Sequence, residues 1–569
     1  MKYSGARILI ESLIENGVDT IFGYPGSAVL NIYDELYKCR GRIRHILVSH
    51  EQHAVHAADG YARSSGRTGV CLATSGPGAT NLVTGIATAF VDSVPVIAIT
   101  GNVSMPLLGK DSFQEVDITG ITMPIVKHNW IVEDVRDLAQ IIREAFVVAQ
   151  SGRPGPVLID IPKDISSSVC EYNGLVDDIR AANGRAGRLL KKTSRETFTE
   201  DDIEKAASLM ENSKRPMLYA GGGVVNSGAG AELKKLAELL GSPVALSLMG
   251  MGAFPVEHPL CTGLIGMHGT VASNKAVQRS DLLIAVGARF SDRVTSCVEL
   301  FAKNAKIIHI DIDAAEINKN VAVDAFIVGD IKQVIERLIK KIGKRSADEW
   351  NGEIEKWKAE KPDVKRRTAS LLNPGFVIKQ TAKALGEKAI VVTDVGQHQI
   401  WTAQFYPFKN QRSFLSSGGM GTMGFGMGAA VGAKIANPAS PVVLFTGDGC
   451  FRMNSAEMAT MVKESSPVLI VIFNNSVLGM LRQWQKFFFG ANYSQTSLED
   501  RGPDFIKLAE AYNVPGFRVT NESSFMEALE KSVSLLSSGK PALIEAVIDK
   551  DERVVPMVPG GKPVDKQII

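Results

Sequence analysis

Short apolar runs rich in valine and isoleucine alternate with stretches of helical length along the whole chain. The runs span residues 70–74, 94–100, 157–161, 217–220, 244–248, 282–286, 307–312, 390–395, 442–446, 468–473 and 542–547. Runs that are apolar at nearly every position are typical of strands buried on both faces of a parallel sheet. The stretches between them are long enough for the helices that connect one parallel strand to the next. The pattern therefore predicts an α/β protein built from doubly wound parallel sheets.

Two segments, 166–195 and 343–367, interrupt this alternation. The first lacks a strand pattern, and the second has 14 charged residues of both signs among its 25 positions. Such segments are typical of linkers or of exposed helices on the surface. A chain of 569 residues is also several times longer than one average domain. We therefore expect three α/β domains, at 1–180, 190–345 and 370–569.

Charge and cysteine content exclude several classes of partner. The chain has 63 lysines and arginines against 61 aspartates and glutamates, so it offers no overall attraction to nucleic acid or to acidic membranes. Its six cysteines are scattered and form no CxxC pair, which argues against a disulfide framework or a zinc ribbon. The sequence has no signal-peptide core and no apolar run that suits a membrane span. We expect a cytoplasmic protein with reduced thiols.

Glycine is the one residue in excess, with 53 copies. Without a collagen period, such an excess indicates backbone that lies close to a neighbour or a ligand. One glycine-rich motif, Gly447-Asp448-Gly449, directly follows a strand-like run, which places Asp448 at the carboxyl end of a strand, where α/β proteins bind ligands. The next such run ends in Asn474-Asn475. A carboxylate, an amide oxygen and a backbone carbonyl at this edge form an oxygen set that suits Mg²⁺ with ligand phosphates.

This pair of motifs resembles the signature of enzymes that depend on thiamine diphosphate (ThDP). The resemblance implies that Asp448, the side chain of Asn475 and the backbone carbonyl of Val477 hold Mg²⁺ on the diphosphate. We expect the next helix to begin near Asn454 or Ser455 and to direct its N-terminal amides toward the phosphates.

A second region fits the same family. Glu51 follows a strand-like run at 46–48 and opens a helix-like segment, 51–62. The residues around it, 48–54, resemble the pyrimidine-domain motif of ThDP enzymes, as does Gly23-Tyr24-Pro25-Gly26 upstream. The resemblance implies that Glu51 protonates the aminopyrimidine ring, so that its imino form can accept the C2 proton of the thiazolium. Such a glutamate must be buried and its pKa tuned for proton transfer.

Two other patterns suggest different chemistry and are incomplete. His50, His53 and His56 recur at every third position, whereas a zinc-binding HExxH helix needs its second histidine four residues after the first. Residues 419–424 fit the dinucleotide motif GxGxxG, but the acidic residue expected at the end of the next strand is missing. This segment instead resembles the ThDP-family loop that holds the aminopyrimidine, which implies that Met423 is the bulky side chain beneath the bent cofactor.

Over its whole length, the sequence resembles the catalytic subunits of the acetohydroxyacid synthase (acetolactate synthase) family, of the anabolic type that contains FAD. The segments that carry the resemblance are 109–115, 151–156, 266–270, 287–295 and 479–484. It implies a pyrimidine-binding, a central FAD-binding and a diphosphate-binding domain. It also implies an enzyme of branched-chain amino acid biosynthesis that decarboxylates pyruvate and joins the two-carbon unit to pyruvate or 2-oxobutyrate. The products would be 2-acetolactate or 2-aceto-2-hydroxybutyrate.

The resemblance also assigns residues to each ligand. Those at ThDP are Pro25, Gly26, Glu51, Gln397, His398, Gly421, Met423, Gly449, Cys450, Asn475 and Met480. Those at FAD, a structural cofactor in this family, are Arg153, Gly221, Gly222, Gly223, Met267, His268, Gly269, Gly287, Arg289, Asp292, Arg293, Asp311 and Asp330. Those at the substrates are Phe113, Gln114, Lys163, Arg289 and Trp484, and the catalytic set is Glu51, Phe113, Gln114 and Met423.

Three of these side chains suit an acceptor 2-oxoacid on chemical grounds. The amide of Gln114 can donate a hydrogen bond to the oxyanion that develops on the acceptor. The guanidinium of Arg289 suits the acceptor carboxylate. Trp484 would contact the alkyl group and favour 2-oxobutyrate by roughly 10–200-fold, which is the range for one methylene in an apolar pocket.

Two positions depart from the family pattern. Ser27 replaces the second glycine of the usual Gly-Tyr-Pro-Gly-Gly, and Arg452 replaces a glutamine. Neither change removes a group that the mechanism needs, so they put substrate affinity and inhibitor binding in question rather than activity.

Two alternative activities stay open on this scaffold. One is a FAD-using oxidoreductase such as pyruvate oxidase, and the other is a simple 2-oxoacid decarboxylase. In the family, the glutamate and the Mg²⁺ site that meet at one ThDP come from different subunits, so the resemblance implies a homodimer at minimum, or a tetramer, and a small regulatory subunit as partner.

Overall fold

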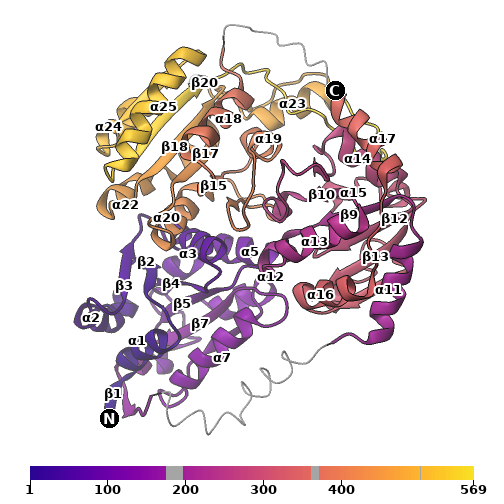
Figure 1. Ribbon diagram of the computed structural model, residues 1–569. Coiled ribbons are helices and arrows are strands. Elements are labelled where there is room, and N and C mark those ends of the chain that lie inside the picture. Colours follow the sequence, from indigo (N-terminus) through magenta and orange to yellow (C-terminus); the bar gives the residue numbers. More distant parts are fainter. Residues whose placement is uncertain (175–196, 361–370, 500–501) are drawn as a thin grey trace.

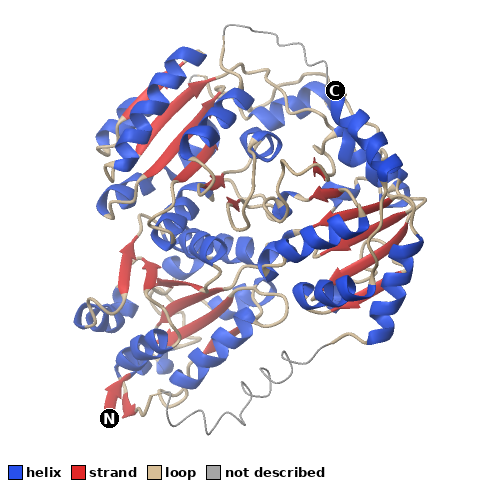
Figure 2. Ribbon diagram, in the orientation of Figure 1, coloured by secondary structure: helices blue, strands red, loops and turns tan. Residues whose placement is uncertain are grey.

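Three six-stranded sheets, one after another along the chain, form the framework of the protein (Figure 1). The computed structural model describes residues 1–174, 197–360, 371–499 and 502–569. All strand pairs within the three sheets are parallel. Helices cover both faces of each sheet (Figure 2). The predicted fold class, α/β with doubly wound parallel sheets, is confirmed. Among the described residues, no helix is both long and apolar enough to cross a membrane.

The first lobe is built on the sheet β3-β2-β4-β5-β7-β6. Its strands are β2 (Thr20–Gly23), β3 (Arg44–Leu47), β4 (Gly69–Ala73), β5 (Val96–Asn102), β6 (His128–Ile131) and β7 (Val157–Pro162). Its helices are α1 (Gly5–Glu15), α2 (Leu30–Lys38), α3 (Glu51–Ser65), α4 (Pro77–Asn81), α5 (Val83–Val91), α6 (Ile118–Thr122), α7 (Leu138–Gln150) and α8 (Lys163–Ser167).

The third lobe repeats this topology in the sheet β16-β15-β17-β18-β20-β19. Its strands are β15 (Ile390–Thr393), β16 (Phe414–Leu415), β17 (Val442–Gly447), β18 (Val468–Asn474), β19 (Gly516–Val519) and β20 (Ala542–Val547). Its helices are α18 (Pro374–Leu385), α19 (Gln397–Phe405), α20 (Gly426–Ala436), α21 (Asp448–Asn454), α22 (Met458–Lys463), α23 (Gly479–Phe488), α24 (Phe505–Ala511) and α25 (Glu522–Ser537). In both outer sheets, the strand order reverses between the strands that come first and third along the chain. These are β2 and β4 in the first lobe, and β15 and β17 in the third lobe.

The middle lobe has a different strand order, β11-β10-β9-β12-β13-β14, which is the order found in dinucleotide-binding folds. Its strands are β9 (Pro216–Ala220), β10 (Val244–Leu246), β11 (Cys261–Leu264), β12 (Leu282–Val286), β13 (Lys306–Asp311) and β14 (Ala325–Val328). Its helices are α11 (Glu200–Asn212), α12 (Gly222–Ser227), α13 (Gly230–Leu240), α14 (Val271–Arg279), α15 (Asp292–Thr295), α16 (Ile331–Lys341) and α17 (Asp348–Ala359).

The apolar runs identify the inner strands of each sheet except β2, but not the edges. All eleven runs coincide with strands, and none of the eleven is an edge strand. Of the six edge strands, only β3 is indicated, by the strand-like run at 46–48. The other edges are short or partly exposed, as in β16, with two residues, and β6, with no fully buried position. A strand that faces solvent on one side does not need a continuous apolar run.

Both segments expected to be linkers contain ordered structure. Within 166–195, β8 (Val169–Glu171) pairs antiparallel with β1 (Lys2–Ser4), while residues 175–196 lie outside the described residues. Within 343–367, α17 is amphipathic: Trp350, Ile354 and Trp357 are buried against the middle lobe, and residues 361–370 lie outside the described residues. The charged residues within α17 therefore belong to a packed helix rather than to a linker.

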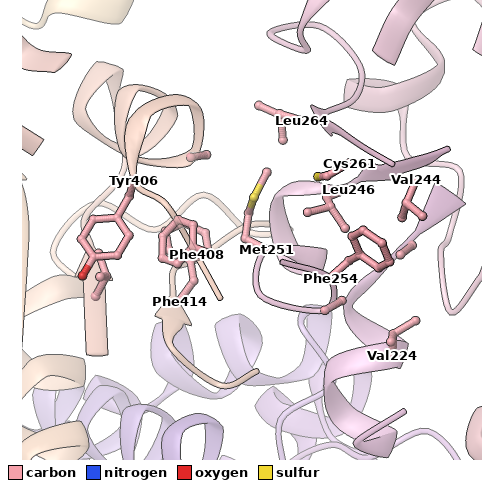
Figure 3. Close-up of a cluster of buried hydrophobic side chains, with 14 of the residues drawn as sticks. Val224, Val244, Leu246, Met251, Phe254, Cys261, Leu264, Tyr406, Phe408 and Phe414 are labelled. Atoms are coloured by element: carbon pink, nitrogen blue, oxygen red, sulfur yellow. The ribbon is translucent and has the colours of Figure 1, made fainter. Parts of the chain in front are cut away.

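The lobes share buried contacts. One hydrophobic cluster is continuous from the middle lobe into the third, and Figure 3 shows Met251 beside Phe408 and Phe414. The first and third lobes meet where α3 packs on α20. A Cβ on Gly60 would overlap the backbone of Ala429, and a Cβ on Gly432 would overlap the carbonyl of Ala57. The two helices therefore approach backbone to backbone, which only glycine permits.

We predict that Gly432→Ala lowers the stability of the protein by about 1–3 kcal/mol, because the added methyl forces α3 and α20 apart. The midpoint of thermal unfolding measures this. Gly352→Ala is the control, because Gly352 is an exposed residue of α17 whose Cβ would meet nothing within 4 Å. It should stabilise by about 0.5–1 kcal/mol through helix propensity. Equal stability of wild type and Gly432→Ala would contradict the close approach.

Candidate active site at three strand crevices

Ligands of open parallel sheets bind outside the carboxyl ends of the strands, where the strand order reverses. Each of the three sheets has such a crevice, and the residues predicted from the sequence gather at all three. We call these sets the first, middle and third groups, after the lobes that carry them.

The first group lies at the ends of β2, β3 and β4. Glu51 is the first residue of α3, and Asn81 donates its side-chain amide to Glu51 Oε2 at 2.9 Å. A Cβ on Gly78 would lie 2.7 Å from the side chain of Thr74 and 3.3 Å from Glu51 Oε1. A Cβ on Gly26 would overlap the same threonine. Glycine thus lets the turns after β2 and β4 close around the glutamate.

The surroundings of Glu51 are more open than the sequence suggests. In this single chain, the glutamate is half-buried rather than buried, and the neighbouring Tyr24 and Pro25 are exposed. The carboxyl edge of the first sheet is therefore uncovered on the side of Glu51.

The loop 109–115 carries Phe113 and Gln114 to this edge. The carboxylate of Glu115 accepts hydrogen bonds from the backbone amides of Gly109, Lys110 and Ser112, the last at 2.9 Å. These hydrogen bonds, with that of Ser112 the strongest, hold the pKa of Glu115 below its usual value. Glu115 could not be singled out from the sequence, because its partners are backbone groups.

The loop brings Gln114 close to Glu51. The φ of Gln114 is +59°, and a Cβ on Gly76 would lie 2.8 Å from the carbonyl oxygen of Gln114. Gly76 and Gly78 lie in one turn, so Gln114 and Glu51 contact the same short segment. Phe113 extends outward, with 84% of its surface exposed. Lys163, the exposed first residue of α8, lies at the end of the neighbouring β7.

The third group is centred on Asp448, which is 5% exposed. The expected helix start near Asn454 or Ser455 is wrong: α21 begins at Asp448 itself. The carboxylate therefore lies in the first turn of the helix, where the helix dipole favours negative charge. Burial raises the pKa of Asp448 to about 7, against backbone hydrogen bonds from Gly449 and others and the positive charge of Arg452. The departure at Arg452 thus acts on this carboxylate.

The side chain of Asn475 is oriented by hydrogen bonds to its neighbours. Its side-chain NH₂ donates to Gln397 Oε1 at 3.2 Å, and its Oδ1 accepts the amide of Val477 at 3.3 Å. Gln397 in turn donates to Gln483 and to the carbonyl of Glu552. Gln397 therefore acts as an orienting partner of Asn475.

Other predicted residues of the third group surround Asp448. A Cβ on Gly447 would lie 3.1 Å from the ring of His398. Among the described residues, the buried His398 has no hydrogen-bond partner at Nε2, and burial lowers its pKa to about 3. A Cβ on Gly449 would lie 3.8 Å from Met423 Cε. The thiol of Cys450 is buried and donates to the carbonyl of Val395 at 3.1 Å.

The middle group lines a cavity of about 990 Å³ at the crevice between β9 and β12. All the residues predicted for FAD except Gly269 line this cavity, as do Gly421, Met480 and Trp484 of the third lobe. Gly269 instead closes a tight turn, with its amide bonded to the carbonyl of Gly266. The cavity therefore extends from the middle lobe to the third lobe.

The charged residues of the cavity are held mostly by protein partners. Arg153 pairs with Glu316 at 3.0 Å and bonds to Ser93, and Arg289 donates to the carbonyl of Val91 at 2.7 Å. Burial raises the pKa of Asp311 to about 6. Two buried atoms on the cavity wall, His268 Nε2 and Glu316 Oε2, lack hydrogen-bond partners in the part of the chain that the structure describes. Glu316 was not predicted, because no motif includes it.

The glycines of this crevice serve the chain itself. A Cβ on Gly221 would overlap the carbonyl of Gly287, and a Cβ on Gly223 would lie 2.7 Å from the Cα of Gly287. They allow the turns after β9 and β12 to touch. These glycines therefore pack against each other. Their approach to a ligand stays a prediction.

The three histidines of α3 and its cap lie in different environments. His50 caps the helix by accepting the amide of Gln52, His53 bonds to Glu457 at 2.8 Å, and His56 is buried against Phe425. They pack the first lobe onto the third.

Comparison with protein families gives matches in all three lobes. The family described as "Thiamine pyrophosphate enzyme, N-terminal TPP binding domain" matches residues 3–121. The corresponding central domain matches 203–338, and the C-terminal TPP binding domain matches 394–546.

Curated relatives cover nearly the whole chain. The "Acetolactate synthase large subunit" of Cyanidium caldarium is 46% identical over 98% of this chain and 95% of its own. The "Acetolactate synthase" of Mycobacterium bovis is 46% identical, covering 99% of this chain and 91% of its own. The "Probable acetolactate synthase large subunit" of Methanocaldococcus jannaschii is 46% identical, covering 98% and 94%.

We predict that Glu115→Ala frees the loop 109–115. The amides of Gly109 and Ser112 should exchange with deuterium about tenfold faster or more, because each loses a hydrogen bond to a charged acceptor. Since the pKa of Glu115 is lowered, the tether is complete above the usual glutamate pKa and is lost as the pH falls through the lowered value. Glu133→Ala, at an exposed glutamate, is the control. Unchanged exchange in Glu115→Ala would exclude the tether.

Proposed function

Because the chain belongs to the acetolactate synthase large subunits of the thiamine pyrophosphate enzyme family, we propose that it is the catalytic subunit of an acetolactate synthase. It decarboxylates pyruvate with the help of ThDP and joins the two-carbon unit to pyruvate or 2-oxobutyrate. The observation that carries this proposal is the 46% identity over 98% of the chain, together with three crevices that hold the residues this chemistry needs.

The third group fits a magnesium diphosphate. Asp448, Asn475 and the carbonyl of Val477 offer the oxygen donors that Mg²⁺ prefers beside phosphates. The buried, unpartnered Nε2 of His398 and the glycine turn at 447–449 suit the rest of the cofactor. ThDP bound there would supply the carbon nucleophile that takes up the two-carbon unit of pyruvate.

The first group supplies the proton and the acceptor contacts. Glu51 holds a proton at its carboxyl group, while Asn81 fixes one of its oxygens. Gln114, which contacts the same turn, donates a hydrogen bond to the oxygen of the acceptor as negative charge develops there. Phe113 and Trp484 exclude water from the alkyl side of the acceptor, and Lys163 and Arg289 attract its carboxylate.

The middle group fits FAD as a bound structural cofactor. The strand order is that of dinucleotide-binding sheets, and the cavity of about 990 Å³ is large enough for such a ligand. The unpartnered atoms His268 Nε2 and Glu316 Oε2 provide hydrogen-bonding groups on its wall.

The open edge of the first lobe supports a proposal about the oligomeric state of the protein. Phe113 and Met123 are 84% and 68% exposed, and Tyr24 is exposed as well. We propose that a second copy of the chain covers this edge and supplies its third group to Glu51, in a homodimer at minimum or a tetramer. A small regulatory subunit is a further proposed partner, because relatives are named large subunits, and a cytoplasmic location remains our expectation.

Product analysis tests the activity. With pyruvate, ThDP, Mg²⁺ and FAD, the protein should form acetolactate as its main product, and added 2-oxobutyrate should divert product to 2-aceto-2-hydroxybutyrate. Acetaldehyde as main product would indicate a decarboxylase instead. Acetyl phosphate or acetate with flavin reduction would indicate an oxidase, and either result rejects the proposal.

We predict that Glu51→Gln slows exchange of the C2 proton of bound ThDP by roughly 10²–10⁴-fold, which is the usual contribution of a general acid–base group. Binding of ThDP with Mg²⁺ should be largely retained, because the third group is unchanged. Exchange is followed by NMR after quenching in deuterated buffer, with Glu133→Gln as control. Exchange at the wild-type rate would remove Glu51 from proton transfer.

A further inference from the structure

An arginine and two aspartates meet at the inner end of the first lobe. Arg63 on α3 pairs with Asp59, one turn earlier, at 2.5 Å, and with Asp92, just after α5, at 3.0 Å. The side chains of both aspartates are 0% exposed, and that of Arg63 is 9% exposed. One guanidinium thus serves two buried carboxylates. A buried carboxylate in excess of its cations needs further hydrogen-bond donors.

The two aspartates find their donors in different places. Both oxygens of Asp59 are bound by Arg63, at 2.5 and 3.1 Å. Asp92 shares Oδ2 between Arg63 and the backbone amide of Gly418, at 3.0 Å each, and its Oδ1 accepts the amide of Gly419 at 2.8 Å. The excess charge of the first lobe is therefore met by backbone amides of the third.

Further bonds fix the same segment, which we call the dividing segment, residues 416–423. Arg63 donates to the carbonyl of Ser416 at 3.0 Å, and the hydroxyls of Thr88 and Thr422 are 2.6 Å apart. Just beyond Met423, the amide of Gly424 donates to Asp394 at 2.8 Å. Met423 is thus held between an anchor on the first lobe and an anchor within the third.

The dividing segment separates two sites. Its residues 417–421 line the cavity of the middle group, while Met423 at its end reaches the turn at Gly449 beside Asp448. The segment has little room to shift, because a Cβ on Gly418 would overlap the sulfur of Met249 and a Cβ on Gly419 would overlap Val91. The carboxylate of Asp92 bonds the backbone at these two positions.

We propose that Asp92 is a positioning residue for both cofactor sites. Through the amides of Gly418 and Gly419, it places the wall of the middle cavity and, at the end of the same segment, Met423. The identity of the two ligands as FAD and ThDP rests on the proposed function. The placement of the segment rests on the hydrogen bonds of the chain itself, of which Asp92 makes the two to Gly418 and Gly419.

A comparison of Asp92→Asn with Asp59→Asn tests the proposal, because both variants neutralise one buried partner of Arg63, whereas only Asp92 contacts the dividing segment directly and Asp59 reaches it through Arg63. An asparagine at 92 has one acceptor oxygen, so it cannot serve both glycine amides and Arg63 together. The measurements are the ThDP dissociation constant in the presence of Mg²⁺, the absorption and fluorescence spectra of bound flavin, kcat and KM separately, and the unfolding midpoint.

We expect Asp92→Asn to weaken ThDP binding about tenfold or more, to shift the flavin spectrum and to lower kcat more than it raises KM. Asp59→Asn should lower the unfolding midpoint and leave ThDP affinity and the flavin spectrum at wild-type values. The proposal is overturned if the two variants change affinity and spectrum alike, or if Asp92→Asn changes only the unfolding midpoint.

A second variant covers the case in which the aspartate variants do not fold. Thr88→Val removes a second anchor on the first lobe, the bond to Thr422, without touching a charge, and it should weaken ThDP binding in the same direction with a smaller effect. Wild-type affinity in Thr88→Val would overturn the proposal. A wild-type protein that binds neither ThDP nor FAD would instead contradict the proposed function, so the two failures are distinguishable.

Discussion

The backbone-to-backbone contact of α3 with α20 is the constraint on which the site depends. Each of these helices is continuous with part of the site. Glu51 opens α3, and Asp59 and Arg63 lie further along it, while α20 begins three residues after Met423. Gly60 and Gly432 allow the two helix axes to come as close as two helices can. Any change in this contact therefore moves Glu51 and the dividing segment of the same chain relative to each other.

Carboxylates that accept backbone amides organise the glycine-rich loops of the site. Asp92 accepts the amides of Gly418 and Gly419, Asp394 accepts those of Gly424 and Gly426, and Glu115 accepts that of Gly109 and two others. A glycine amide is readily reached because no side chain shields it, and a carboxylate can accept several such bonds. This accounts for two features of the composition together. The glycine excess provides accessible amides, and the balanced net charge conceals negative charges that are compensated locally by backbone donors.

The sequence was most informative where a local run of residues determines a strand and therefore the position of the residues that follow it. Continuous apolar runs located the central strands, and the residues directly after them, such as Asp448 and Asn475, necessarily came to the carboxyl edge of the sheet. Edge strands escaped notice because solvent on one side relaxes their pattern. Asp92 and Glu115 could not be found in this way, because they act on backbone amides, and a sequence does not indicate which amide a loop will present. The start of α21 at Asp448 was missed because Gly447, its cap, has no side chain to signal a helix.

The middle cavity adjoins the dividing segment, which suits the structural role proposed for FAD. Residues 417–421 of the segment line the cavity together with Asp92, which bonds the segment, and the place of a Cβ on Gly421, whose φ is +68°, has nothing nearer than 4.0 Å. A planar ligand in the cavity would contact the segment beside its anchor on Asp92 and so limit the motion of Met423. Under the proposed function, FAD therefore completes the rigid wall that the first lobe begins, and the geometry of the ThDP site depends on both.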